Sequence, residues 1–277
     1  MDIDLAPDTT EELRRFAFGK NWRRFLTSIN SERLAAAERS LRDMLEIERL
    51  DGARFLDVGS GSGIFSLAAR NLGARVHSFD YDPDSVACAE GLKATRFPND
   101  SQWTIARASA LDTTYLSGLG DWDVVYCWGV AHHTGDMWRA LGNVADCVAP
   151  AGKLFVAIYN DQGLISRYWL RVKRAYNSNW ALRMAITAFH LPYLFFGRLI
   201  SRVLTGRLMA ARGMSLWYDM VDWLGGYPFE VAKPEAVFDF FRKRGFSMLT
   251  FRTCGGRHGC NEFVFMHERG GGVGGET

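Results

Sequence analysis

The spacing of hydrophobic and polar positions changes several times along the chain. Up to about residue 50, apolar residues recur at helical spacing among Arg and Glu, and short apolar runs then alternate with helical stretches. Strands are predicted at 54–58, 75–79, 103–106, 123–127 and 153–159, with helices among them at 64–71, 83–93 and 137–148. Strands that alternate with helices in this way predict a mainly parallel sheet with right-handed crossovers.

The alternation stops near residue 161. Residues 162–212 have a helical pattern, and the α/β pattern resumes at 234 with a helix to about 244 and strands at 247–253 and 262–267. We therefore expect four parts, which are an N-terminal helical segment (1–50), an α/β domain (51–160 and 234–268), a helical insertion (161–233) and a flexible glycine-rich tail (269–277).

A glycine-rich loop follows the first predicted strand and precedes a helix. Its residues, 57–63, read DVGSGSG, and glycines there let the backbone approach a ligand beside the N–H groups of a helix N-terminus. A dinucleotide fingerprint requires a further glycine where Ile64 stands, which weakens the NAD interpretation. Asp80 ends the next strand, where an acid can accept hydrogen bonds from ribose hydroxyls. The alternative is a turn residue, because Asp82-Pro83 also favours a turn.

The run FLDVGSGSGIFSLAARNLGARVHSFDYDP resembles the first two motifs of class I S-adenosylmethionine-dependent methyltransferases. The resemblance continues through ASALD, DVVYCWGVAHHT, VAPAGKLFVAIYN and the closing NEFVFMHE, so that it spans roughly residues 50–160 and 234–268. It implies a Rossmann-like α/β fold with helices on both faces of the sheet and a reversed last strand. The chain is broadly similar to methyltransferases of quinone and natural-product biosynthesis.

The same resemblance implies a set of cofactor-binding residues. The loop would lie at the methionine end of S-adenosylmethionine, through Asp57, Gly59, Ser60, Gly61 and Gly63. Asp80 would hold the ribose and Tyr81 would lie against the adenine. The remaining contacts would come from Ser109, Ala110, Leu111, Cys127 and Trp128. Ser109 stands where many relatives carry an acidic residue, so we expect backbone contacts there from Ala110 and Leu111.

Candidate catalytic residues come from three segments of the chain. His132 and His133 follow the fourth strand, and histidine suits a general base near neutral pH; we favour His133, with a structural role as the alternative. Tyr159 ends the fifth strand and is placed to face the acceptor. Asp219 and Asp222 share a face if their segment is a helix, where they would hold a polar acceptor among aromatic residues. The alternative is that those aromatic residues only pack the insertion onto the core.

The insertion is strongly basic, with nine Arg or Lys and no Asp or Glu from residue 162 to 212. We rank first a lid that covers the acceptor. The alternatives are a helix on an anionic membrane surface, dependent on Arg198, Arg202 and Arg207, or arginines that hold an acidic acceptor. The whole chain carries a net charge of only +2 and shows no RNA-binding module, so a nucleic-acid partner is disfavoured.

Composition also bears on the cellular location of the protein and on metal binding. The five cysteines do not form the pattern of a secreted disulfide-bonded protein, and the start of the chain lacks a signal-peptide pattern. No apolar run reaches the roughly 20 residues of a membrane span. We therefore expect a cytoplasmic protein, with peripheral membrane contact as an alternative. Cys254, His258 and Cys260 match no usual zinc spacing, and we assign no metal.

The sequence thus predicts an enzyme that transfers a methyl group from S-adenosylmethionine to a small molecule, with oxygen favoured as the acceptor atom. Alternatives are S-methylation of a thiol, methylation of a lipid or lipid-linked acceptor, and a cofactor-binding partner subunit without turnover.

Overall fold

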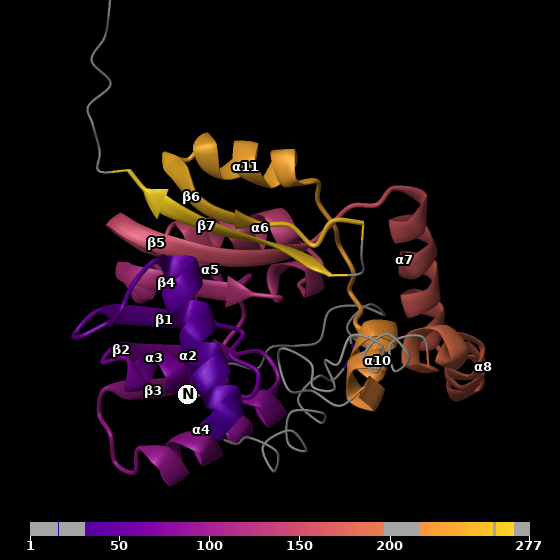
Figure 1. Cartoon of the computed structure of the whole chain (residues 1–277), viewed down its shortest axis with the longest axis horizontal. Coiled ribbons are helices and arrows are strands. Elements are labelled where there is room, and N and C mark those ends of the chain that lie inside the picture. The colour runs from indigo at the N-terminus through magenta and orange to yellow at the C-terminus, as the bar shows by residue number, and fades with distance from the viewer. Residues whose placement is uncertain (1–15, 17–30, 197–215, 257–258, 269–277) are drawn as a thin grey trace, which may run out of the picture. The chain divides into compact units, whose positions relative to one another are not determined.

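The computed structural model of the chain describes residue 16 and residues 31–196, 216–256 and 259–268 (Figure 1). It divides into two compact units: unit 1 is Met1–Ala17 with Gly163–Phe229, and unit 2 is Phe18–Gln162 with Glu230–Thr277. Within the described ranges, no helix is long and apolar enough to cross a membrane. The predicted tail at 269–277, and the N-terminal segment up to residue 30 apart from Phe16, lie outside the description.

Unit 2 is built on one seven-stranded sheet in the order β3-β2-β1-β4-β5-β7-β6. Its strands are β1 (Arg54–Val58), β2 (Arg75–Asp80), β3 (Trp103–Arg107), β4 (Trp122–Trp128), β5 (Val148–Tyr159), β6 (Phe246–Arg252) and β7 (Cys260–His267). Neighbours from β3 to β5 run parallel, whereas β7 is antiparallel to both β5 and β6. The predicted Rossmann-like, mainly parallel sheet with a reversed last strand is therefore confirmed.

Helices cover both faces of the sheet. One face carries α2 (Ser31–Leu45), α3 (Ile64–Asn71) and α4 (Pro83–Arg96), and the other carries α5 (Thr113–Gly118), α6 (Met137–Ala145) and α11 (Pro234–Arg242). Side chains alternate across a strand, so Phe55 of β1 packs with the first group of helices and Leu56 with the second. Figure 1 shows α2 crossing in front of the strands.

Some predicted boundaries were wrong. The first helix ends at Leu45 instead of near residue 50. The helix predicted to reach residue 148 ends at Ala145, and Val148 already begins β5. The prediction also missed α5, which has only six residues and therefore too few positions to show a period.

Unit 1 contains α7 (Leu164–Tyr176), α8 (Trp180–Leu191), a π-helical turn η3 (Pro192–Phe196) and α10 (Leu216–Gly225). The predicted helical stretch is thus interrupted after Tyr176, and Asn179 caps α8 by accepting a hydrogen bond from the N–H of Leu182. Residues 197–215, including Arg198, Arg202 and Arg207, lie outside the described ranges.

Aromatic packing joins α7 to α10. The ring of Trp169 meets that of Trp223 edge-on at 5.4 Å between centroids. Lys173 is fully buried; its ammonium donates to the Trp223 carbonyl and lies 4.5 Å from the centre of the Trp223 ring. Trp223 is therefore a packing residue within unit 1.

Candidate active site

The strand order reverses between β1 and β4, which lie side by side and parallel. In open α/β sheets, ligands bind outside the carboxyl ends of the strands at such a switch point. The glycine loop follows β1, Asp80 ends β2, and the two predicted histidines follow β4. The fold thus gathers three separate sequence motifs along the edge where a ligand is expected.

Glycine is required twice in the loop after β1. Gly59 and Gly63 have φ angles of +68° and +77°, which other residues adopt only with strain. A Cβ atom on Gly59 would lie 2.5 Å from Cγ2 of Val130, and one on Gly63 would lie 3.0 Å from Cα of Ala89. The loop is therefore packed closely against the segment after β4 on one side and against α4 on the other.

Asp57, at the end of β1, is almost fully buried and ends a chain of buried polar groups. Its carboxylate accepts a hydrogen bond from the hydroxyl of Ser66 on α3. The Oγ atoms of Ser66 and Ser78 are 2.7 Å apart, and Ser78 accepts from Nε1 of Trp103 at 2.8 Å. Because Ser66 gives its only hydroxyl proton to the carboxylate, Ser78 must donate to Ser66. While Asp57 is ionised, the chain therefore has one direction, from Trp103 to the Asp57 carboxylate.

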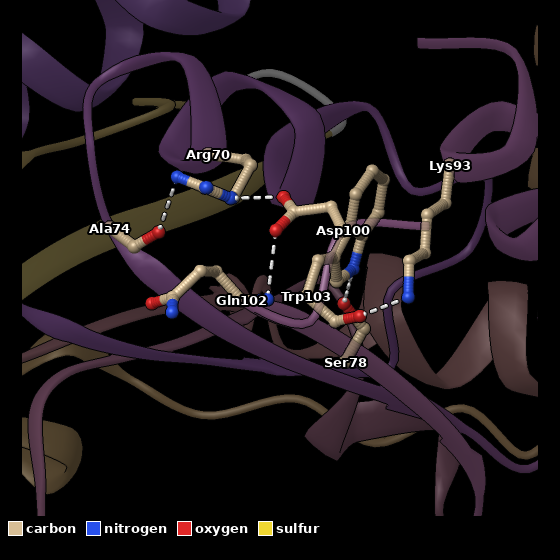
Figure 2. Close-up of polar contacts among 7 residues, drawn as sticks. All are labelled: Arg70, Ala74, Ser78, Lys93, Asp100, Gln102 and Trp103. Atoms are coloured by element: carbon tan, nitrogen blue, oxygen red, sulfur yellow. Dashed lines mark hydrogen bonds and ion pairs between the residues drawn. The ribbon is translucent and has the colours of Figure 1, made fainter. Parts of the chain in front are cut away.

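Figure 2 shows how the far end of this chain is anchored. The carbonyl of Trp103 accepts from the ammonium of Lys93 on α4. Arg70, one turn after Ser66 on α3, pairs with Asp100 at 2.5 Å in the segment just before β3. Helix α3 therefore contacts the polar chain near Asp57 and also fixes the entry to the strand that carries Trp103.

Two carboxyl groups of this site titrate near neutral pH. Burial raises the pKa of Asp57 to about 7. The hydrogen bonds from Ser66 lower this pKa in part, and the negative charge of Asp80 raises it further. Burial likewise raises the pKa of Asp80 to about 6, against hydrogen bonds from the backbone N–H groups of Asp82 and Gly61. A cation bound beside these carboxylates would lower both pKa values, since an opposite charge favours the ionised form.

Asp80 connects the end of β2 to the glycine loop. Its Oδ2 accepts from the N–H of Gly61 and its Oδ1 from the N–H of Asp82, both at 2.9 Å. Asp80 is therefore a turn residue, as the alternative interpretation of the sequence expected, because it accepts from the N–H of Asp82. The same carboxylate also holds the glycine loop through Gly61. Tyr81, predicted to lie against the adenine, follows it with 39% of its surface exposed.

The segment after β3 is fixed by its own contacts. The hydroxyl of Ser109 accepts from the N–H of Leu111 at 3.1 Å, and the side chain of Asn143 donates to the carbonyl of Ala110 at 3.0 Å. Ser109 therefore uses a backbone donor that we expected to face the adenine.

Cys127 and Trp128, at the end of β4, differ in burial. The Cys127 thiol is fully buried among core side chains, and burial raises its pKa to about 12. Trp128 is half-buried, and its Nε1 donates to Glu262 of β7 at 2.9 Å. The thiol of Cys127 is therefore a core group, while Trp128 is tied to β7, which pairs with the far side of β5.

His132, His133 and Tyr159 form a cluster of three rings. The centroids of His132 and Tyr159 are 3.9 Å apart, and His133 stands edge-on, 4.5 Å from His132 and 5.5 Å from Tyr159. His132 is 1% exposed, whereas His133 is half-buried. The structure thus brings three predicted catalytic residues together and leaves His133 the more accessible histidine.

A segment from the end of unit 1 back into unit 2 secures this cluster. The N–H of Glu230 donates to the carbonyl of His132 at 3.0 Å, and the Glu230 carboxylate accepts from the N–H of Met137, which starts α6. Two residues later, the N–H of Ala232 donates to the carbonyl of Tyr159 at 3.0 Å. Residues 230–232 therefore tie the turn after β4 to the end of β5.

The other two predicted catalytic residues belong to unit 1. Asp219 and Asp222 lie on α10, so the helix required for them to share a face is present. Asp222 is half-buried, and the side chain of Asp219 lies outside the description. Their joint role with the ring cluster of unit 2 remains a prediction.

One polar atom of the loop fits a ligand. The hydroxyl oxygen of Ser60 is buried and has no hydrogen-bond partner among the described residues. Leaving a buried hydroxyl unsatisfied costs about 1–3 kcal/mol, a cost that a polar ligand at the loop would offset. Together with the carboxylates of Asp57 and Asp80, which accept hydrogen bonds, this hydroxyl fits a polar, positively charged ligand.

Sequence reasoning missed several residues of the site. Ser66 and Ser78 appear in the sequence as small polar residues within a predicted helix and strand, and only their burial identifies them. Trp103 gave no signal beyond a strand start. Glu230 lies far from the histidines in the chain, and no motif links them.

Comparison with known proteins gives the family. A family model described as a methyltransferase domain matches residues 28–203. A ubiquinone biosynthesis O-methyltransferase from Xanthomonas oryzae pv. oryzae is 33% identical over 116 residues, which are 40% of this chain and 46% of that protein. The chain thus spans about half the length of the curated relatives it matches.

Solved structures agree on the fold. A magnesium protoporphyrin IX methyltransferase from Synechocystis PCC 6803 with bound SAM aligns with a TM-score of 0.57 and 12% identity, covering 95% of this chain and 99% of that one. The [4+2]-cyclase SpnF aligns with a TM-score of 0.54 and 12% identity over 84% of this chain and 80% of that one. Likeness at this identity establishes the fold alone. Because the family model matches well over half of the 277 residues, the chain belongs to the methyltransferase domain family.

Proposed function

We propose that this protein transfers a methyl group from S-adenosylmethionine to a small molecule, with oxygen as the favoured acceptor atom. The observation that carries the proposal is the buried Asp57, held by Ser66 beside Asp80 at the switch point of the sheet. When ionised, these two adjacent carboxyl groups form a negatively charged site, which suits a ligand that carries positive sulfonium and ammonium groups.

S-adenosylmethionine supplies a methyl group on an electrophilic sulfur. In this proposal Asp57 and the glycine loop hold its methionine end, and Asp80 accepts hydrogen bonds from the ribose. Tyr81 covers the adenine. Ser60 gains a polar partner for its hydroxyl. Asp80 keeps the loop in shape through Gly61 before any ligand binds, so the site is preorganised.

The acceptor is proposed to bind near the ring cluster. Methyl transfer is an in-line displacement, so the protein's main tasks are to position the acceptor and remove its proton. We propose His133 as the base, because His132 is buried and its carbonyl is engaged by Glu230. Tyr159 would orient the acceptor. For unit 1 we propose a role in acceptor recognition through Asp219 and Asp222.

Calorimetry with S-adenosylhomocysteine tests the cofactor site. Asp80→Ala removes the acceptor for the ribose and for Gly61, and Gly61→Val places a branched side chain where φ is +54°, so each change should greatly weaken binding. Asp43→Ala, which removes an exposed acid on α2, is the matched control and should bind like the unaltered protein. Equal affinity in all four proteins would overturn the site assignment.

The acceptor atom is tested separately with panels of phenols and thiols. O-methylation predicts that His133→Asn loses most turnover near neutral pH. A thiolate is already a good nucleophile, so S-methylation predicts that the same variant keeps most of its activity at high pH.

A further inference from the structure

Helix α8 exposes an apolar surface in unit 1. Trp180, Met184 and Phe189 are 78%, 62% and 76% exposed, and Tyr193, just beyond the helix, is 61% exposed. At about 100° per residue, these positions with Leu182 span roughly 220° of the helix circumference. The only Arg of α8, Arg183, falls outside this arc and points back to α7, where it donates to the carbonyl of Tyr176. Exposed apolar faces of this width are typical of interaction surfaces.

Helix α7 carries a basic stripe with one apolar residue. Leu164, Arg167, Arg171 and Arg174 recur at spacings of three, four and three, which places them on one face, and all four are exposed. The opposite face is buried through Trp169 and its neighbours. Neither Arg167 nor Arg171 forms an ion pair with any described residue. From residue 162 to 218 the chain contains no acidic residue.

We propose that this α7–α8 surface (Leu164, Arg167, Arg171, Trp180, Met184 and Phe189) docks on an anionic lipid membrane. The positive charge, unopposed along this part of the chain, is complementary to anionic headgroups. The wide arc of large apolar side chains suits insertion at the boundary between headgroups and acyl chains, and the exposed Trp and Tyr have an apolar body with a polar tip that matches this boundary.

Charge argues against the simplest alternative occupant, which is a second copy of the chain. A symmetric dimer through this surface would bring two basic, acid-free faces together, and like charges in a shared interface are unfavourable. A lipid surface instead removes the apolar side chains from water and pairs the arginines with phosphate groups. The inference concerns unit 1 alone and does not depend on methyl transfer.

Vesicle co-sedimentation of the full chain tests the proposal. Vesicles of phosphatidylcholine with about one-third phosphatidylglycerol should bind the protein, those of phosphatidylcholine alone should bind it weakly, and high salt should release it. Arg167→Gln with Arg171→Gln should weaken binding to the anionic vesicles about 25-fold, at roughly fivefold per basic residue near the surface. Trp180→Ser with Phe189→Ser should weaken it at least as much at low salt.

A matched control removes two exposed arginines of unit 2, Arg39→Gln with Arg139→Gln, and should leave binding nearly unchanged. Circular dichroism checks that each variant is folded, and S-adenosylhomocysteine binding, tested in parallel, reports on the proposed function independently. The comparison of vesicle compositions needs no variant. Equal binding to both compositions, no binding to either, or an equal loss in the control pair would overturn the proposal. Sedimentation velocity that shows a dimer disrupted by the Trp180 and Phe189 substitutions would overturn it in favour of self-association.

Discussion

Ser66→Ala isolates the hydrogen bond that holds Asp57 in its ionised form. The substitution removes a small buried hydroxyl from α3 and leaves the helix and the glycine loop in place. A hydrogen bond to a charged group contributes about 1.5–3 kcal/mol. Since one pKa unit corresponds to about 1.4 kcal/mol, its loss should raise the pKa of Asp57 by roughly one to two units above its value of about 7.

This shift changes how ligand affinity depends on pH. If the ionised carboxylate binds the positive end of the ligand, affinity follows the ionised fraction of Asp57. For the unaltered protein, affinity should rise with pH and level off above about pH 7.5, because the pKa of Asp57 is about 7. For Ser66→Ala it should still be rising near pH 8.5, and the two proteins should differ by roughly 8- to 75-fold near pH 6.5 and converge at high pH.

Calorimetric titration with S-adenosylhomocysteine across this pH range measures the effect. Ser85→Ala is the control, because it removes another buried serine, on α4, that forms no hydrogen bond with Asp57. It should show the unaltered pH profile. If Ser66→Ala has the same midpoint as the unaltered protein, or loses affinity equally at every pH, then Ser66 does not control the ionisation of Asp57 and the reasoning is refuted.

Three further predictions concern stability and the ring cluster. Gly59→Ala forces a side chain into left-handed backbone and against Val130, so thermal unfolding should show a loss of about 1–3 kcal/mol, and an unchanged Tm would contradict this. Because the pKa of Asp57 is raised on folding, the folded state binds more protons than the unfolded state between about pH 4 and pH 7, and stability falls as pH rises through that window. Asp57→Asn should therefore be more stable than the unaltered protein at pH 8 in denaturant unfolding while it loses ligand binding; lower stability at pH 8 would count against the raised pKa. Glu230→Ala removes the acceptor for the start of α6 and should lower kcat about tenfold or more through His133 with little change in S-adenosylhomocysteine affinity, whereas a parallel loss of affinity would show that its role is general.

The sheet was predictable because its signals are local. β1 is a short apolar run, the glycines after it adopt positive φ, and α3 follows with helical spacing of its apolar residues. Both the residue types and the spacing of apolar positions therefore mark this part of the fold in the sequence. Asp80 was predictable for the same reason. An acidic residue at the end of the second strand indicates a ligand-binding position even when none of its contacts is known. The boundary at Val148 was not, because the pairing that begins β5 there is made with Trp122, far away in the sequence.

The supporting residues of the site could not be predicted in this way. Ser66 acts on Asp57 only because α3 packs with that face toward the end of β1. Trp103 donates to Ser78 because the pairing of β2 with β3 brings the two side chains together. Glu230 reaches His132 only after the chain returns from unit 1. Each of these contacts depends on tertiary packing between segments that carry no recognisable motif. A single sequence therefore does not predict them.

The most direct test of the central claim follows the methyl group itself. The purified chain would be incubated with methyl-labelled S-adenosylmethionine and fractionated cell extract, and label would be measured in the volatile, aqueous, lipid and macromolecular pools, with Asp80→Ala as the inactive comparison. Our account predicts label in a small-molecule pool that depends on Asp80. No label in any pool, from a protein that binds S-adenosylhomocysteine, would contradict methyl transfer and favour a cofactor-binding partner subunit.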